Sequence, residues 1–200
     1  MASRSVLIIA LLLASSGVYA SAVPDGYQRI ARQHGVPPES LYSVALAESS
    51  KRLPHGERPW PWTLNVAGKG YRYNTRLEAW QALQVFMKKH PLKRIDVGVA
   101  QVNLGWNGHH FSSTWDALEP YTNLNAAATI LRNCYDQRPG SWLAAAGCYH
   151  HPAGGKHAAR YTAIVKRKLE TLNRPRKNTG GEMASIIPES HFIWTEPRSL

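Results

Sequence analysis

Residues 44–50, with the sequence VALAESS, constrain the fold most strongly, because apolar side chains recur here at the spacing of one helix face. Leu41, Val44 and Ala45 share that face, and the next position on it is Glu48. A buried, unpaired carboxylate is costly, so such a group is usually paired, protonated or kept for chemistry. The alternative is that Glu48 lies at a frayed helix end and reaches water or a Lys or Arg side chain.

Apolar residues recur with helical spacing along most of the chain, which predicts a mainly helical α+β domain. The predicted helices cover residues 24–35, 38–48, 75–90, 123–131, 142–149 and 156–172. The one strand signal is a small β-hairpin, with strands near residues 62–66 and 71–73 and a glycine-bearing turn at 67–70. Polar residues and prolines at 51–61 interrupt the pattern, and residues 96–104 are too few to classify.

Polar residues mark the starts of three of these helices. Thr75 and Glu78 have the spacing of a capping box. Asn123 and Ser141 are the predicted N-caps of two later helices. The predicted inward stripe of the helix after Thr75 consists of Leu77, Trp80, Gln84 and Met87.

The N-terminus has the pattern of an export signal, which predicts a periplasmic protein. Arg4 precedes an apolar run at residues 6–14, and small residues suited to cleavage follow it. We therefore predict a signal peptide at residues 1–22, one domain at 23–172 and a basic, Pro- and Gly-containing flexible tail at 173–200. An uncleaved membrane anchor is the alternative, whereas after cleavage no stable membrane insertion is expected.

The chain carries a formal net charge of +11, which suits an anionic polymer as a partner. Nucleic acid and anionic cell-wall material both fit this charge, and so does a basic surface that is merely solvated. The sequence contains no nucleic-acid-binding motif, so we predict no nucleic-acid partner.

The cysteine and histidine residues are the candidates for a disulfide or a metal site. Cys134 and Cys148 can form one disulfide in an oxidising compartment, or remain two buried thiols, and spacing alone leaves both open. The histidines at 109–110, 150–151 and 157 lack the spacing of a two-His ligand motif. We predict no metal and no cofactor.

Several short motifs occur in an order that resembles one enzyme family. They are Glu48-Ser49 at a helix end, Gly98 to Val102, Asn123 to Leu131, Cys148-Tyr149-His150, and Tyr161. Over residues 24–172 the chain resembles the lysozyme-like catalytic domain of soluble lytic transglycosylases. Residues 60–70 look like the subgroup associated with conjugation and with type IV pilus or secretion systems. Ala100 and His150 depart from the family, which usually has Met and Asn there.

The resemblance implies a lysozyme-like helical domain, with the hairpin beside an active-site cleft, that cleaves peptidoglycan. Glu48 would be the catalytic acid, and the 1,6-anhydro product would form without water. The implied substrate-binding residues are Ser49, Gln101, Asn103, Tyr149, His150, Tyr161 and Trp62. Trp60, Trp106 and Trp115 could also stack on sugars or pack in the core. The implied partners are glycan strands and components of an envelope secretion or pilus system.

Three alternatives remain from the sequence. A muramidase of the same fold would hydrolyse the glycan and usually needs a second carboxylate, for which Asp96 and Glu57 are the nearest candidates. A non-catalytic peptidoglycan-binding assembly module would bind the wall without cleaving it. A DNA-binding accessory protein rests on charge alone.

Overall fold

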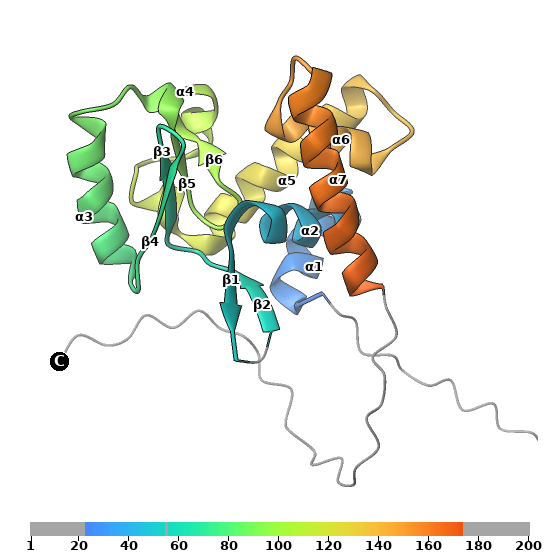
Figure 1. Ribbon diagram of the computed structural model, residues 1–200, viewed down its shortest axis with the longest axis horizontal. Helices are drawn as coiled ribbons and strands as arrows, with labels where there is room; N and C mark the ends of the chain where they lie inside the picture. Colours follow the sequence, from blue (N-terminus) through green and yellow to red (C-terminus); the bar gives the residue numbers. More distant parts are fainter. Residues whose placement is uncertain (1–22, 55, 174–200) are drawn as a thin grey trace, which may run out of the picture.

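The computed structural model describes residues 23–54 and 56–173, which form a helical lobe and a smaller sheet-bearing lobe side by side (Figure 1). The predicted signal peptide lies outside the described residues, and so does the predicted tail apart from Asn173. The helices are α1 (Asp25–Gln33), α2 (Pro38–Ser49), α3 (Arg76–Met87), α4 (Leu104–Asn107), α5 (Pro120–Gln137), α6 (Trp142–His150) and α7 (Gly155–Leu172). The strands are β1 (Ser50–Leu53), β2 (Gly56–Pro59), β3 (Thr63–Val66), β4 (Lys69–Arg72), β5 (Ile95–Val97) and β6 (Val102–Asn103). The described residues are mostly helical with small antiparallel sheets, as the α+β prediction required.

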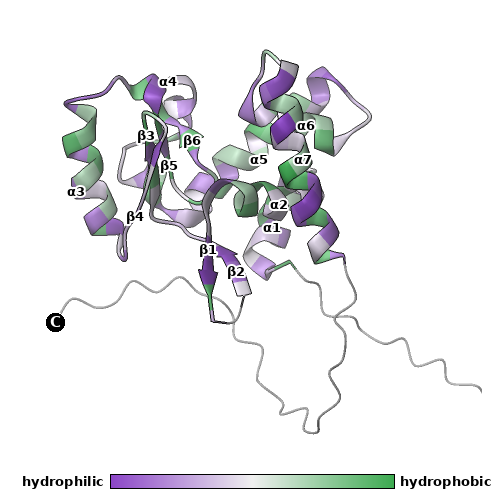
Figure 2. Ribbon diagram, in the orientation of Figure 1, coloured by the Kyte–Doolittle hydropathy of each residue, from purple (hydrophilic) through white to green (hydrophobic). Residues whose placement is uncertain are grey.

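The helical lobe is built around α2, which is buried on most of its surface. Leu41, Val44 and Ala45 are fully buried, as the stripe predicts, and Tyr42 and Leu46 extend the burial to the rest of the helix. Helices α1, α5, α6 and α7 contact α2. Figure 2 shows hydrophobic residues along α2 and hydrophilic ones along β1 and β2. Close packing of these helices around α2 fixes the direction in which the side chains of its last turn point.

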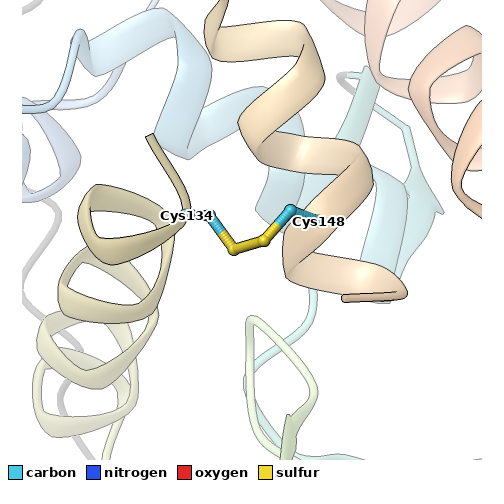
Figure 3. Close-up of a disulfide and its surroundings, with 2 residues drawn as sticks. All are labelled: Cys134 and Cys148. Atoms are coloured by element: carbon cyan, nitrogen blue, oxygen red, sulfur yellow. A yellow bond between two sulfur atoms is a disulfide. The ribbon is translucent and has the colours of Figure 1, made fainter. Parts of the chain in front are cut away.

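A disulfide joins α5 to α6 in this lobe (Figure 3). The Cα atoms of Cys134 and Cys148 are 5.8 Å apart, within the usual range for a disulfide. The structure therefore resolves the choice that the sequence left open between a disulfide and two thiols. The bond connects α5 directly to the helix that carries Tyr149 and His150.

The second lobe contains a four-stranded antiparallel sheet in the order β4-β3-β5-β6. Helix α3 packs on this sheet, and the two enclose a separate core that includes Leu64, Leu83, Ile95 and Val97. The predicted hairpin is confirmed as β3 and β4, whose turn includes Ala67 and Gly68, both with positive φ.

The prediction of a single hairpin was incomplete. Strands β1 and β2 form a second antiparallel pair in the segment that we expected to be irregular, and β5 and β6 lie in the segment left unclassified. These strands are only two to four residues long. Most of β1 and β2 is exposed or half-buried, so the period-two apolar signal that identifies a strand is absent from them.

Two further details of the prediction were wrong. In α3 the fully buried residues are Ala79 and Leu83, whereas Leu77 is 51% exposed. Trp80 and Gln84 of the predicted stripe are half-buried, and the Trp80 indole and the Gln84 amide both donate to the Thr114 hydroxyl. The cap of Thr75 on Glu78 and that of Ser141 on Ala144 are both present.

Asn123 is not the N-cap of α5. The helix begins earlier, at Pro120, and the Glu119 carboxylate caps it by accepting from the Thr122 N–H. Proline favours the first helical position, where its missing N–H is not needed. Asn123 is consequently inside the helix and fully buried, where its side chain bonds a neighbouring turn.

Candidate functional site

A cavity of about 590 Å³ lies between the two lobes. Its lining residues come from the end of α2, from the sheet, from α4 and α5, and from the end of α6 with the turn that follows. They are Glu48, Asn65, Asp96, Gln101, Val102, Asn103, Trp106, Asn107, Ile130, Tyr149, His150, His151, Pro152 and Ala153. Five of the eight predicted catalytic and substrate-binding residues are thus in one cavity, although they are up to about a hundred positions apart in sequence.

Glu48 lies in the last turn of α2, and its side chain is 13% exposed. Its Oε1 is 3.7 Å from Nδ1 of His150. The His150 ring stacks flat on Tyr161 of α7, with ring centroids 4.3 Å apart and an interplanar angle of 2°. Glu48 is therefore neither frayed into solvent nor neutralised by a lysine or arginine within salt-bridge distance among the described residues, so the alternative of a solvated helix end is excluded.

Charge and burial in this group alter the proton affinities of its members. The contact with Glu48 raises the pKa of the His150 imidazole. Burial, followed by the Glu48 charge, raises the pKa of the Tyr161 hydroxyl well above its usual value. Burial and the charges of Glu48 and Asp96 do the same to the pKa of Tyr149. Both tyrosines thus stay protonated near neutral pH, and the site combines two carboxylates with one imidazole that charges readily.

The second carboxylate of the cavity belongs to Asp96 in the middle of β5. Ile95 and Val97 on either side of it are fully buried, so strand alternation directs Asp96 to the opposite face. Burial, with a smaller contribution from Glu48, raises the pKa of Asp96. A half-buried carboxylate with a perturbed pKa in a cavity is a typical feature of functional sites.

The turn at residues 98–101 joins β5 to β6 and accepts hydrogen bonds from, or donates them to, side chains of the helical lobe. Gly98 has φ +85°, and a Cβ there would lie 2.3 Å from the Asn123 amide nitrogen. The Asn123 carboxamide accepts from the Ala100 N–H at 2.9 Å and donates to the carbonyls of Val97 and Ala117. This contact explains why a glycine and an asparagine are found at these two positions.

Two more side chains hold the same turn. The Ser49 hydroxyl donates to the Val99 carbonyl at 2.6 Å, and the Tyr149 hydroxyl donates to the Ala100 carbonyl at 2.7 Å. Three helices thus bind one turn, and the short motifs that are scattered along the sequence meet here. The last residue of this turn is Gln101, which has φ +50° and lines the cavity. The Gln101 amide donates to the Thr63 and Gly98 carbonyls.

Three predicted substrate-binding residues do not line the cavity. Ser49 is fully buried, and its hydroxyl is occupied with backbone groups. Trp62 is 8% exposed and packs in the core of the sheet lobe. The Tyr161 ring stacks on the His150 ring and is not among the residues that line the cavity. These three residues build the site and do not form its surface.

Trp106 is the tryptophan that lines the cavity, and it is 64% exposed. Trp60 and Trp115 are outside it, since the Trp60 indole donates to the Tyr73 carbonyl and Trp115 packs on Trp80 and Arg76. Exposure distinguishes Trp106 from the packed tryptophans, and the sequence does not contain that information.

The described residues contain no group of three or more His, Cys, Asp or Glu side chains that could hold a metal ion. The prediction that metal takes no part stays a prediction. Over the same residues, no helix is long and apolar enough to span a bilayer.

Comparisons of the chain with protein-family models, with curated proteins and with solved structures give no match. The function must therefore be inferred from the site itself.

Proposed function

We propose that this protein is a peptidoglycan lytic transglycosylase with a lysozyme-like fold, and that Glu48 is its catalytic acid. The observation that supports this most is the position of Glu48, which is largely shielded from water at the end of a buried helix and lines a cavity between two lobes. A general acid must reach the oxygen that it protonates, and a carboxyl group that lines a cavity is placed to contact a bound glycan.

The proposed reaction uses Glu48 twice. Its carboxyl group protonates the oxygen that links N-acetylmuramic acid to N-acetylglucosamine, and the bond from that oxygen to C1 breaks. The carbonyl oxygen of the sugar's own acetamido group bonds to C1, as in substrate-assisted glycosidases. The Glu48 carboxylate then takes the proton from the C6 hydroxyl, whose oxygen displaces the acetamido oxygen at C1. The product has a 1,6-anhydro ring, and no water is consumed.

The other residues of the cavity have complementary roles in this proposal. His150 lies beside Oε1 of Glu48, and its positive form stabilises the carboxylate that remains after proton transfer. Trp106 offers an exposed aromatic face on which a sugar ring can stack. Gln101, Asn103 and Tyr149 supply polar surface around the bound glycan.

A hydrolytic muramidase of the same fold is the second candidate, and the presence of Asp96 in the cavity favours it. In that reaction a carboxylate opposite the acid activates a water molecule, which attacks C1. Glu57, the other carboxylate considered, is outside the cavity and forms a salt bridge with Lys168. The products separate the two candidates, because hydrolysis leaves reducing ends and transglycosylation leaves anhydro ends.

The biological setting is also a proposal. The predicted signal peptide would bring the chain to the periplasm, and since the formal charge of +11 loses only Arg4 with that peptide, the mature chain stays strongly basic and is attracted to the anionic cell wall. We propose that it opens the wall locally for an envelope-spanning conjugation or pilus system.

Digestion of purified peptidoglycan sacculi tests the proposal. We expect the wild type to release soluble muropeptides and Glu48→Gln to release none, because an amide cannot donate the required proton. Glu170→Gln is the matched control, since it changes the same charge on a side chain that is 55% exposed on α7. Binding of sacculi without release by folded wild-type protein would contradict the proposal and favour a wall-binding module.

A further inference from the structure

Asp96 is the central member of a row of three polar side chains on the sheet. In the strand register it lies opposite Asn65 of β3 on one side and Asn103 of β6 on the other. All three residues line the cavity. Their strand neighbours Leu64, Val66, Ile95 and Val97 are buried on the other face of the sheet. The sheet therefore presents an amide, a carboxylate and an amide in sequence toward the site.

Hydrogen bonds hold this row in place and leave part of it open. The Asn103 amide donates to Oδ1 of Asp96 at 2.7 Å and to the Lys93 carbonyl at 3.1 Å. The Asn103 oxygen accepts the N–H groups of Gly105 and Trp106, which fixes its orientation at the start of α4. Oδ2 of Asp96 accepts no hydrogen bond from the described residues. A fixed carboxylate with one unused oxygen in a cavity is suited to accept an N–H or O–H group from a ligand.

We infer that Asp96 accepts the acetamido N–H of the sugar whose C1 is attacked, and that it thereby orients the acetamido carbonyl oxygen toward C1. This inference rests on the proposed function, since it assigns a role to a second residue of the same site. Asp96 comes from the sheet lobe and Glu48 from the helical lobe, so a sugar bound between the lobes can contact both at once.

The chemistry explains why a carboxylate is suited to this role. When the acetamido oxygen bonds to C1, the sugar forms an oxazolinium ring, and its nitrogen becomes positively charged while it keeps its hydrogen. The Asp96 carboxylate then accepts a charge-assisted hydrogen bond, which is stronger than the bond to the neutral amide of the substrate. Attack by the C6 oxygen breaks the bond from C1 to the acetamido oxygen and restores the neutral amide. Asp96 keeps its charge throughout, while Glu48 gives one proton to the departing oxygen and takes a different proton from the C6 hydroxyl.

The substitution Asp96→Asn tests the inference with almost no change in shape. Because the Asn103 amide donates to position 96, the new carboxamide must present its oxygen to Asn103 and its NH₂ group to the cavity. Two donors then face each other in the intermediate. We expect turnover of sacculi to fall about 100-fold, similar to the loss of one preorganised hydrogen bond to transition-state charge. Asp116→Asn, which makes the same charge change outside the cavity, should retain wild-type turnover.

Binding measurements distinguish a role in the intermediate from a general effect on structure. The probe is N-acetylglucosamine-thiazoline, whose protonated ring nitrogen copies the oxazolinium N–H. We expect Asp96→Asn to weaken its binding about tenfold or more, while binding of a plain chitooligosaccharide changes by less than about threefold. If Asp96→Asn does not fold, Asp96→Ala removes the acceptor without adding a donor, and the same split is expected.

Three results would overturn the inference. If Asp96→Asn keeps wild-type turnover, or weakens binding of the thiazoline and of the chitooligosaccharide equally, Asp96 does not accept the acetamido N–H. If the wild type forms both kinds of end and Asp96→Asn loses the reducing ends but keeps the anhydro ends, Asp96 is the base that activates water. If the wild type forms anhydro products and Asp96→Asn matches it, the proposed function stands and only this inference fails.

Discussion

Gly98→Ala is the perturbation for which the structure gives the clearest magnitude. An alanine Cβ at this position would lie 2.3–2.7 Å from the atoms of the Asn123 carboxamide. Asn123 is fully buried in α5, so its side chain can move only by giving up hydrogen bonds to Ala100, Val97 and Ala117. Losing these three bonds costs about 3 kcal/mol, at about 1 kcal/mol each. The positive φ adds about 1–2 kcal/mol for a residue with a Cβ.

The expected total is therefore a loss of about 4–5 kcal/mol in the free energy of unfolding. Gly68→Ala is a matched control, because Gly68 has φ +89° and no atom within 4 Å of an added Cβ, so it carries the backbone cost alone. Urea unfolding followed by circular dichroism measures both variants against the wild type. Equal destabilisation of the two variants would refute the argument that the close packing of Gly98 on Asn123 leaves no room for a Cβ.

Three further predictions concern other parts of the molecule. Replacing both cysteines with serine removes a cross-link with a sequence separation of 14 residues and should cost about 3 kcal/mol in the same unfolding assay, whereas an unchanged midpoint would contradict this. Leu83→Ala should lower the free energy of unfolding by about 2–5 kcal/mol and Leu77→Ala by under about 0.5 kcal/mol, because Leu83 is buried and Leu77 is exposed. A larger loss for Leu77→Ala would mean that Leu77 faces the core, as the stripe predicted from sequence has it. NMR titration of the His150 imidazole should give a pKa above the usual value that falls in Glu48→Gln, and an unchanged pKa would show that the two groups do not interact. Since the folded-state pKa is raised, the stability from this contact is complete below the unfolded value near 6.5 and is lost as the pH rises through the folded value.

Much of the helical lobe could be predicted from the sequence, because its helices have apolar residues at helical spacing. The fully buried Leu41, Val44 and Ala45 follow directly from that pattern. The same stripe places Glu48 on the inner side of α2, which is why the central residue of the candidate site could be identified before its surroundings were known. The order of the short motifs then indicated which other segments to expect near it.

The sheet side of the site was predicted less well, although it carries a usable signal. Strands β3 and β5 each place one polar residue between two apolar ones, as Leu64-Asn65-Val66 and Ile95-Asp96-Val97. Each triplet is too short to be distinguished from chance by alternation alone, and only the pairing of the strands joins Asn65 and Asp96 in one row. The sequence therefore indicates Asp96 only as a candidate base for hydrolysis.

The distinction between residues that form the cavity surface and residues that support it depends on packing between distant segments. Ser49 follows Glu48 in the sequence, but its hydroxyl bonds the backbone of a turn fifty residues away. Trp62 and Trp106 are equally suited to stack on sugars, and they differ in exposure, at 8% and 64%. Neither the hydrogen bond nor the exposure can be derived from local sequence, because both are set by tertiary contacts.

The central claim is that Glu48 cleaves the glycan without water, and the ends of the released fragments test it most directly. Sacculi are digested by the wild type in ¹⁸O-labelled water, and the muropeptides are identified by mass spectrometry. We expect 1,6-anhydro ends that contain no ¹⁸O and that are missing when Glu48→Gln is used. Reducing ends that carry ¹⁸O at C1 would contradict it and make the protein a hydrolase.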